Sequence, residues 1–322
     1  MLIKMQVGEQ DRGELQVNVT DSDNAPIRDA RVTISEPETA INPNSPIERL
    51  ETDVSGQTQI VDLNTPPLEY SLNENNENMP YANYNIQIEA PGYETENISN
   101  VEILPDSLSL QDVRMRRREG EQVENIVIDP HTLYAEYPEK IPEDEIKDVN
   151  EPGEIVLSRV VIPEYVVVHN GTPSSNAMDY YVTYKDYIKN VASSEIYATW
   201  PRATIEANVL AIMSFTLNRV YTEWYRNKGY DFTITSSTAY DQKWIYGRNI
   251  FQSIDEVVDE IFDQYLSRPD VRQPILTQYC DGKRVTCPNW LSQWGSCNLG
   301  EQGFGTLEII RNYYGDYMYI NT

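Results

Sequence analysis

One carboxylate, Glu195, stands in an otherwise uncharged run from Asn190 to Pro201. Its sequence neighbours are mostly apolar or aromatic, and the next cation along the chain is Arg202. Burial among such side chains raises the pKa of a carboxyl, because it disfavours the charged form. A carboxyl that keeps its proton near neutral pH can serve as a general acid in glycosidic or acyl chemistry. The residues alone leave a second interpretation open, in which Glu195 ends a helix and accepts hydrogen bonds from backbone amides.

The residues after Glu195 predict a long helix that begins at Pro201. Proline suits the first position of a helix, and glycine at Lys228-Gly229 can end it. Apolar side chains recur between these points at three- and four-residue steps. They are Ile205, Val209, Ile212, Met213, Leu217, Val220 and Trp224.

Two further helices and a last strand are expected downstream. Ser253 and Glu256 have the spacing of a capping box, which predicts a helix start, and Pro269 predicts its end. A short helix is expected over residues 307–314, followed by a strand over 317–320.

Residues 13–115 predict an all-β sandwich. Short segments alternate polar and apolar side chains, as strands with one buried face do, and turn-forming residues separate them. Pro37–Arg49 and Asn73–Asn78 are expected to be long loops. Two more strand-like runs, 155–170 and 180–184, precede the helices.

Residues 117–160 are rich in Glu, Asp and Pro, which favour an extended backbone. We therefore predict a two-domain chain, with a β-sandwich at 1–116, an acidic linker at 117–160 and an α+β domain with a long central helix at 161–322. His131, within the linker, is expected to have a plain surface or packing role.

The net charge of −26 excludes two classes of partner. A chain this acidic repels phosphate backbones and anionic lipid surfaces, so neither nucleic acid nor a membrane surface is expected as a partner. The first ten residues contain no apolar core of a signal peptide, and no apolar run reaches the length of a membrane span.

Cysteine usage leaves two readings open. Cys280 and Cys287 flank a segment with the turn-forming pair Asp281-Gly282, which is compatible with a disulfide across a small hairpin. Three free thiols in a reducing compartment are an equal alternative. Metal binding by these cysteines is not expected, because neither histidine, His131 or His169, lies near them in sequence.

The N-terminal segment resembles the carboxypeptidase-regulatory-like, prealbumin-type β-sandwich. The resemblance rests on residues 24–32, on Thr52-Asp53 with Gly56, and on Tyr84-Asn85-Ile86 leading to residues 90–93. It covers about the first 115 residues and implies a structural or docking module.

The C-terminal half resembles the SpoIID/LytB family of sporulation-associated lytic transglycosylases. Three blocks in the family's order carry the resemblance. The first comprises residues 187–196, 200–201 and 207–211, the second 237–238, 241–242 and 246–247, and the third 291–295, Gly303, 309–310 and 313–315.

The family resemblance implies cleavage of peptidoglycan glycan strands between N-acetylmuramic acid and N-acetylglucosamine, without a cofactor. The catalytic glutamate of the family falls on Glu195, which would serve as acid and then as base while a 1,6-anhydro ring closes. Substrate-binding positions are expected at Ser194, Ser237, Gln242, Tyr246, Gln293 and Trp294. Trp244 and Trp290 are further candidates for stacking on sugars, although a core role is equally expected of such aromatic residues.

Two departures from the family pattern support an alternative. Glu206 and Met213 stand where the family places a lysine and an arginine, and the zinc ligands of some members are replaced around Ala239, Tyr240 and Asp241, so no metal is expected. The alternative is a catalytically weakened relative that binds glycan or builds an envelope or a phage-tail-like particle. Either protein would work at the cell envelope or outside the cell, carried by a particle or released by lysis. An open groove at Glu195 would favour catalysis, and a sealed Glu195 would not.

Overall fold

The computed structural model describes residues 11–37, 45–118, 123–147 and 157–322. The chain is mixed α/β and separates into two compact units. Unit 1 contains the chain up to Pro130 together with Tyr197–Thr199 and Tyr246–Ser253. Unit 2 contains His131–Ile196, Trp200–Ile245 and Ile254–Thr322.

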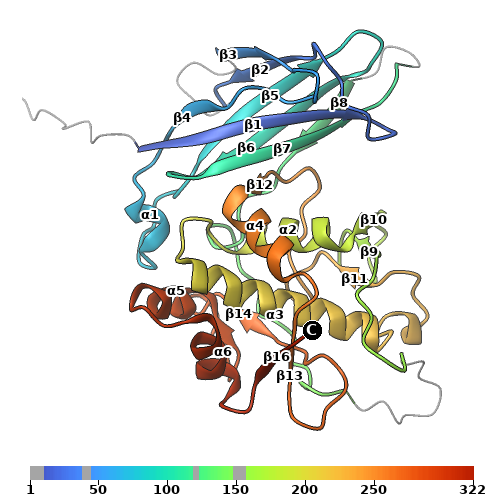
Figure 1. Cartoon of the computed structure of the whole chain (residues 1–322), viewed down its shortest axis with the longest axis vertical. Helices are drawn as coiled ribbons and strands as arrows, with labels where there is room; N and C mark the ends of the chain where they lie inside the picture. Colours follow the sequence, from blue (N-terminus) through green and yellow to red (C-terminus); the bar gives the residue numbers. More distant parts are fainter. Residues whose placement is uncertain (1–10, 38–44, 119–122, 148–156) are drawn as a thin grey trace, which may run out of the picture. The chain divides into compact units, whose positions relative to one another are not determined.

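Unit 1 is β-rich and contains two sheets (Figure 1). The four-stranded sheet has the order β12-β7-β1-β4, and the five-stranded sheet the order β3-β2-β5-β6-β8. The strands are β1 (Asp11–Asp21), β2 (Arg31–Ser35), β3 (Pro46–Glu51), β4 (Val61–Thr65), β5 (Ala82–Glu89), β6 (Thr95–Ile103), β7 (Leu108–Met115), β8 (Val123–Val127) and β12 (Ile250–Phe251). A short helix, α1 (Glu69–Leu72), follows β4.

Alternation along the strands builds the core of unit 1. In β1, Leu15, Val17 and Val19 are fully buried, whereas the residues between them are partly exposed. Successive side chains of a strand point to opposite faces, so one apolar residue in two is enough to fill the core. The expected loop over Pro37–Arg49 is wrong in its second part, because β3 occupies it and pairs with β2. Residues 38–44 of that predicted loop lie outside the described residues.

A segment that interrupts unit 2 in sequence belongs to unit 1. Ile250 and Phe251 form β12, which pairs antiparallel with β7. The side chain of Asn249 accepts from the Glu102 amide at 3.1 Å and donates to the Glu102 carbonyl at 2.8 Å. The Arg248 guanidinium lies 2.9 Å from the Glu102 carboxylate, and both side chains are buried. Residues 246–253 are therefore fixed by backbone pairing and by a buried ion pair.

Unit 2 is organised on the predicted long helix, α3 (Arg202–Tyr221). This helix is buried on nearly all sides, because α2 (Tyr184–Glu195), α5 (Gln293–Glu301), α6 (Thr306–Tyr314) and β13 (Tyr265–Ser267) all pack against it (Figure 1). Pro201 precedes its first turn as expected. It ends seven residues before Lys228, and a 3-10 turn (Arg226–Lys228) leads to Gly229 in the left-handed conformation.

The predicted bounds of the next helix are wrong. Helix α4 runs from Gln252 to Ile261, so Ser253 lies inside it rather than at its cap. The Ser253 hydroxyl donates to the Ala198 carbonyl at 3.2 Å. Tyr265 and Leu266, which fall within the helix predicted to end at Pro269, lie in β13 instead. An apolar run at the end of a helical pattern fits a short buried strand equally well.

Short strands complete unit 2. A three-stranded sheet has the order β10-β9-β11, and β13 and β14 pair with β16 and β15. These strands are β9 (Tyr165–His169), β10 (Asp179–Thr183), β11 (Ile234–Thr235), β14 (Tyr279–Cys280), β15 (Leu291–Ser292) and β16 (Tyr319–Asn321). Of the strand predicted over 155–170, residues 155 and 156 lie outside the described part, and strand structure begins only at Tyr165.

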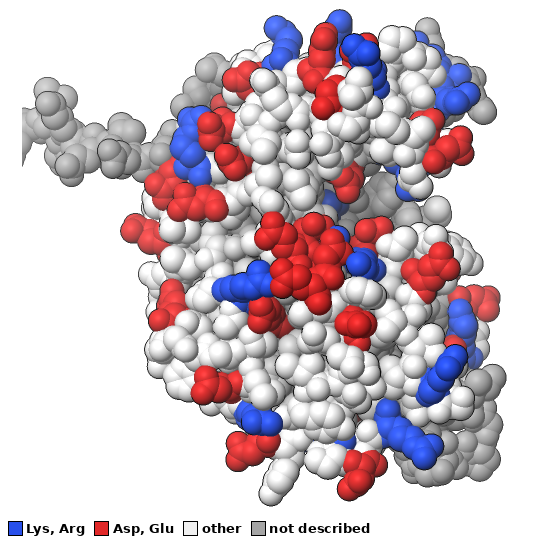
Figure 2. Space-filling model, viewed as in Figure 1, with Lys and Arg blue, Asp and Glu red and all other residues white. Residues whose placement is uncertain are grey.

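The exposed side of α4 carries acidic residues, which form a red patch in Figure 2. Lysines of α2 offset part of this charge. Lys189 lies 2.6 Å from Asp255 and 3.1 Å from Asp259, and Lys185 lies 3.1 Å from Asp259. Burial and these carboxylates act in opposite directions on the pKa of Lys189, and the net effect is to raise it.

The predicted linker does not behave as a free tether in its described part. The boundary between the units falls after Pro130, and residues 131–147, here named the strap, belong to unit 2. Six side chains of the strap are almost fully buried: His131, Thr132, Leu133, Tyr137, Lys140 and Lys147. His131 is wholly buried, so of its two expected roles the packing role is the one observed. Residues 119–122 and 148–156 of the predicted linker lie outside the described residues.

No helix in the described ranges has the length and apolarity needed to cross a membrane.

Candidate functional site

Glu195 is the last residue of α2 and is fully buried. Its Oε1 accepts a hydrogen bond from the Lys243 backbone amide at 2.7 Å, whereas its Oε2 has no hydrogen-bond partner. The side chain of Gln293 donates to the Glu195 backbone carbonyl at 3.1 Å. Glu195 thus ends a helix and accepts a hydrogen bond from a backbone amide, as the second interpretation predicts, but its other carboxyl oxygen accepts no hydrogen bond.

Tyrosines and one lysine surround this carboxyl. The Tyr279 hydroxyl is close enough to act on its pKa, although no full hydrogen bond forms between them. Lys140 of the strap is 6 % exposed, and its ammonium lies 4.2 Å from the centre of the Tyr279 ring. The same ammonium donates to the Asp241 carbonyl at 3.0 Å. Tyr137, also from the strap, donates to the Gln293 side chain at 3.5 Å.

Burial raises the pKa of Glu195, although Lys140, Tyr279 and the Lys243 amide oppose the shift. Burial also lowers the pKa of Lys140, and the nearby Glu195 charge opposes that change. The pKa of Tyr279 lies well above its ordinary value, because the ring is buried and faces Glu195. A buried acid with neutral phenols around it is the environment in which a carboxyl keeps its proton.

The strap is bonded to the residues on both sides of Glu195. The Thr132 amide donates to the Ser194 carbonyl at 3.0 Å, and the His131 ring lies 3.3 Å from the Ile196 carbonyl. The hydroxyls of Ser194 and Thr132 are buried without a partner. The strap therefore packs against a buried polar cluster whose hydrogen-bonding groups are only partly satisfied.

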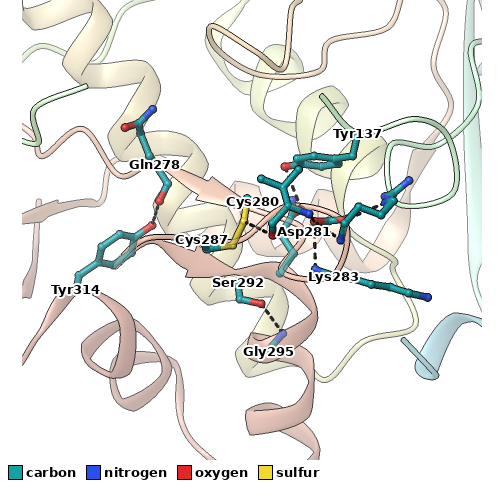
Figure 3. Close-up of a disulfide and its surroundings, with 12 residues drawn as sticks. Tyr137, Gln278, Cys280, Asp281, Lys283, Cys287, Ser292, Gly295 and Tyr314 are labelled. Atoms are coloured by element: carbon teal, nitrogen blue, oxygen red, sulfur yellow. Dashed lines mark hydrogen bonds and ion pairs between the residues drawn. A yellow bond between two sulfur atoms is a disulfide. The ribbon is translucent and has the colours of Figure 1, made fainter. Parts of the chain in front are cut away.

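A disulfide loop holds the other side of the strap (Figure 3). Cys280 and Cys287 are bonded to each other, which decides between the two readings of the cysteines, and Cys297 is buried outside the pair. Within the loop, the Asp281 carboxylate accepts from three successive amides and from the Arg284 guanidinium at 2.7 Å. Arg284 in turn donates to the carbonyls of Thr132, at 3.0 Å, and of Ala135.

A second buried charge network fixes the end of the strap. Arg219 of α3 lies 2.7 Å from Asp241 and 2.5 Å from Glu143 of the strap. The Asp241 carboxylate also accepts from the Tyr225 hydroxyl at 2.6 Å and from the Thr235 hydroxyl at 2.6 Å. Asp241 thus has a structural role, since its lone pairs are used within the protein.

Two predicted site residues adjoin Glu195 directly, and a third is the sequence neighbour of its partner Lys243. Ser194 precedes Glu195, Gln293 binds its carbonyl, and Gln242 lies next to Lys243 in sequence. Gln242 is fully buried, and its side chain bonds to Tyr187 at 3.1 Å, to Thr216 at 2.8 Å and to the Ile212 carbonyl. Gln242 therefore connects core residues through hydrogen bonds, and its side chain does not reach the surface, where a substrate would bind.

The other predicted substrate-binding residues lie elsewhere. Trp294 is 5 % exposed and packs on Trp200, with ring centres 5.2 Å apart. Trp244 is also buried, against Tyr180, whereas Trp290 and Ser237 are half-buried. Tyr246 belongs to unit 1, where its hydroxyl lies 3.3 Å from Glu124.

Glu206 and Met213, the two departures from the family pattern, have structural roles in α3. Glu206 accepts from Arg202 at 2.9 Å and from the Thr306 hydroxyl at 2.6 Å, which ties α3 to α6. Met213 is fully buried. Neither is among the groups that act most strongly on Glu195, which are Lys140, Tyr279 and Lys243.

Across the described residues, no group of three or more His, Cys, Asp or Glu side chains is placed to hold a metal ion.

Sequence reasoning missed Tyr137, Lys140 and Tyr279. Tyr137 and Lys140 lie in the segment interpreted as a linker, where aromatic and basic residues interrupt a run of acids and prolines. Aromatic residues within such a segment indicate that it packs against a folded domain, because segments that stay disordered contain few aromatic residues. Tyr279 precedes Cys280 directly, and nothing in its local sequence connects it with Glu195.

Comparison with known proteins gives weak likenesses only. No family model matches the chain, and no curated protein matches it. Among solved structures, an Acinetobacter radioresistens catechol 1,2 dioxygenase is 13% identical to this chain, with a TM-score of 0.25. The match covers 37% of this chain and 58% of the dioxygenase. The Bacillus anthracis TIE protein is 13% identical, with a TM-score of 0.22, and the match covers 33% of this chain and 17% of the TIE protein. The Streptococcus agalactiae minor pilin GBS52 is 16% identical, with a TM-score of 0.24, and the match covers 35% of this chain and 48% of the pilin. The chain thus spans under two thirds of each structure, and with such low TM-scores these likenesses carry no argument.

Proposed function

We propose that this protein is a peptidoglycan lytic transglycosylase of the SpoIID/LytB type, with Glu195 as its acid and base. In this proposal unit 2 is the SpoIID-like domain, and unit 1 is a carboxypeptidase-regulatory-like sandwich that positions the protein in a larger assembly. The observation that carries the proposal is the Glu195 carboxyl itself, which has a raised pKa and one unpartnered oxygen.

The chemistry needs one carboxyl in two protonation states. Protonated Glu195 donates its proton to the glycosidic oxygen, and the bond from that oxygen to C1 of the muramoyl residue breaks. The resulting carboxylate then takes the proton of the C6 hydroxyl as the C6 oxygen bonds to C1. The products are a 1,6-anhydromuramoyl end and a free N-acetylglucosamine hydroxyl, and Glu195 regains its proton.

Lys140 supplies the positive charge that Glu206 and Met213 do not. A cation near a carboxyl stabilises the charged form, so Lys140 stabilises Glu195 during the base step. Its own ammonium is held by the Asp241 carbonyl and the Tyr279 ring. In the proposed enzyme, the strap thus contributes a positioning residue in place of the expected basic residues on α3.

Glu195 is sealed in this structure, which by itself does not favour catalysis, so the proposed cleavage requires a second conformation in which Glu195 is open. A glycan strand reaches Oε2 only after the strap moves away from Ser194 and Ile196, which requires loss of the Thr132 and Arg284 hydrogen bonds. The unpartnered Ser194 hydroxyl then joins Glu195 at the opened surface.

The same burial favours a second candidate function. A protein whose Glu195 stays sealed would be a catalytically weakened SpoIID-like protein that binds glycan or builds an envelope or phage-tail-like assembly. The roles of Glu206 and Met213 in packing are consistent with it. Both candidates work at the cell envelope or outside the cell, delivered by a particle or by lysis.

Digestion of purified glycan strands, with and without stem peptides, separates the two. Mass spectrometry of the products should reveal 1,6-anhydromuramoyl ends from the wild type and none from Glu195→Gln. Glu139→Gln, an exposed carboxylate on the strap, is the matched control and should retain activity. Strand binding without new ends at any enzyme concentration would favour the second candidate.

A further inference from the structure

Unit 1 contains a pocket of about 380 Å³ that the proposed chemistry does not use. Strands β6, β7 and β8 and the segment at Tyr246-Gly247 line it. Three of its lining side chains, Ile98, Val113 and Ile126, are aliphatic. It therefore has an apolar wall inside an otherwise polar and charged lining.

Two residues that line this pocket each have a buried oxygen atom without a partner. Glu96 is 2 % exposed, and its Oε1 accepts no hydrogen bond. Gln111 is 1 % exposed, and its Oε1 is likewise unpartnered. The orientation of the Gln111 amide is fixed, because its nitrogen donates to the carbonyls of Asp112 at 3.1 Å and Gly247 at 3.2 Å. An unsatisfied buried acceptor is costly, so two in one cavity point to a missing donor.

The charges around the pocket leave Glu96 without its own cation. Arg116 lies 3.5 Å from Glu124, and Arg114 donates to the Asn24 side chain. Glu124 sits directly opposite Glu96 in the parallel pairing of β6 and β8. A neutral donor could satisfy the two oxygens, but a cation also offsets the negative charge of this pair of carboxylates, which Arg116 offsets only in part.

We propose that this pocket binds a primary ammonium group on an unbranched aliphatic stem, as in a lysyl side chain. The ammonium has three donors, which match the free oxygens of Glu96 and Gln111, and the methylene stem packs on Ile98, Val113 and Ile126. A guanidinium is a poorer match, because its planar fork needs two acceptors in one plane. The inference is independent of the function proposed for Glu195.

Binding should be linked to protonation of Glu96. Burial, and then Glu124, raise the pKa of Glu96 to about 7, while Arg116 opposes the shift and Glu94 adds to it. Asp112, Arg114 and Tyr246 are the other charged or titratable groups that line the pocket. An ammonium selects the carboxylate form, so affinity should rise about tenfold between pH 6 and pH 8, the range in which Glu96 loses its proton.

The test is a calorimetric titration of the whole protein with Nα-acetyl-lysine methylamide at pH 6 and pH 8. The norleucine analogue, which has the same stem without the ammonium, should bind at least tenfold more weakly. Glu96→Gln should weaken lysine binding and remove its pH dependence. Asn97→Ala, on the opposite face of β6, should leave both unchanged.

Three results would overturn the inference: equal binding of the lysine and norleucine compounds, tighter binding of the arginine compound, or no heat with either. If Glu96→Gln fails to fold, amide chemical-shift changes in the wild type decide the matter. The ammonium probe must then shift β6, β7 and β8 and leave unit 2 unshifted.

Discussion

The Lys243 amide donates to Oε1 of Glu195 at 2.7 Å, and the second oxygen of that carboxyl has no partner. One backbone hydrogen bond fixes the orientation of the side chain without neutralising it. The protein thus buries an unsatisfied acceptor at the end of α2, at a cost in stability.

Glu195→Gln should stabilise the protein, and more so at alkaline pH. The pKa of Glu195 is raised in the folded protein, so its favourable proton binding is complete below the unfolded pKa and is lost as pH rises through the folded one. Glutamine keeps the acceptor for the Lys243 amide and carries no charge. The midpoint of thermal unfolding should increase relative to wild type from pH 6 to pH 9, whereas Glu139→Gln should not change it. A lower midpoint for Glu195→Gln at pH 9 would contradict a raised pKa.

Lys140→Met should move the alkaline limit of activity to higher pH. Lys140 lowers the pKa of Glu195, so its removal raises that pKa further. Glu195 then stays protonated at higher pH, while the base step loses its cation and the maximal rate falls. Lys140→Arg keeps the charge and should retain the wild-type profile. A pH–rate profile that is unchanged in Lys140→Met would show that Lys140 acts only through packing.

Arg284→Ala should increase the rate of strand cleavage. Its guanidinium holds two carbonyls of the strap, and each hydrogen bond contributes about 1 kcal/mol net, so the loss of both, about 2 kcal/mol, should increase the population of the open state about thirtyfold. Lys283→Ala, in the same disulfide loop, is the matched control. Hydrogen exchange at the Thr132 amide reports the opening directly and should accelerate in Arg284→Ala alone. Faster exchange without faster cleavage would mean that the strap does not limit access to Glu195.

The buried pair of Glu102 and Arg248 should dominate the stability of unit 1. Arg248→Met leaves the Glu102 carboxylate buried without a cation, which costs about 3 to 5 kcal/mol in such pairs. Replacing both, as Glu102→Leu with Arg248→Met, should recover most of that loss in urea unfolding. A double variant no more stable than Arg248→Met would show that the pair is not a coupled unit.

The sequence predicted elements well where one periodicity operates over a long stretch. Leu15, Val17 and Val19 alternate on β1, and Ile205, Val209 and Ile212 repeat on α3, so local pattern and burial agree. Tyr265 and Leu266 follow the helical spacing of α4 but lie in a strand, because their pairing with residues 319–321 is decided by tertiary contacts. Prediction was least successful for the strap, whose burial depends on partners more than fifty residues away, such as Ser194 and Arg284.

Dependence on partners distant in sequence also explains why only part of the candidate site could be predicted. Glu195 stands out by its uncharged neighbours, and Gln293 by its place in the third block of the family pattern. Lys140 and Tyr279 reach Glu195 from distant parts of the chain. Composition indicated an acidic tether at Lys140, whereas the structure shows a buried ammonium.

The central claim is that Glu195 cleaves glycan strands, and the most direct measurement is the yield of 1,6-anhydromuramoyl ends from purified strands by mass spectrometry. We expect such ends from the wild type, more from Arg284→Ala, and none from Glu195→Gln, which should still bind strands. No anhydro ends from wild type or Arg284→Ala at high enzyme concentration, or undiminished ends from Glu195→Gln, would contradict it.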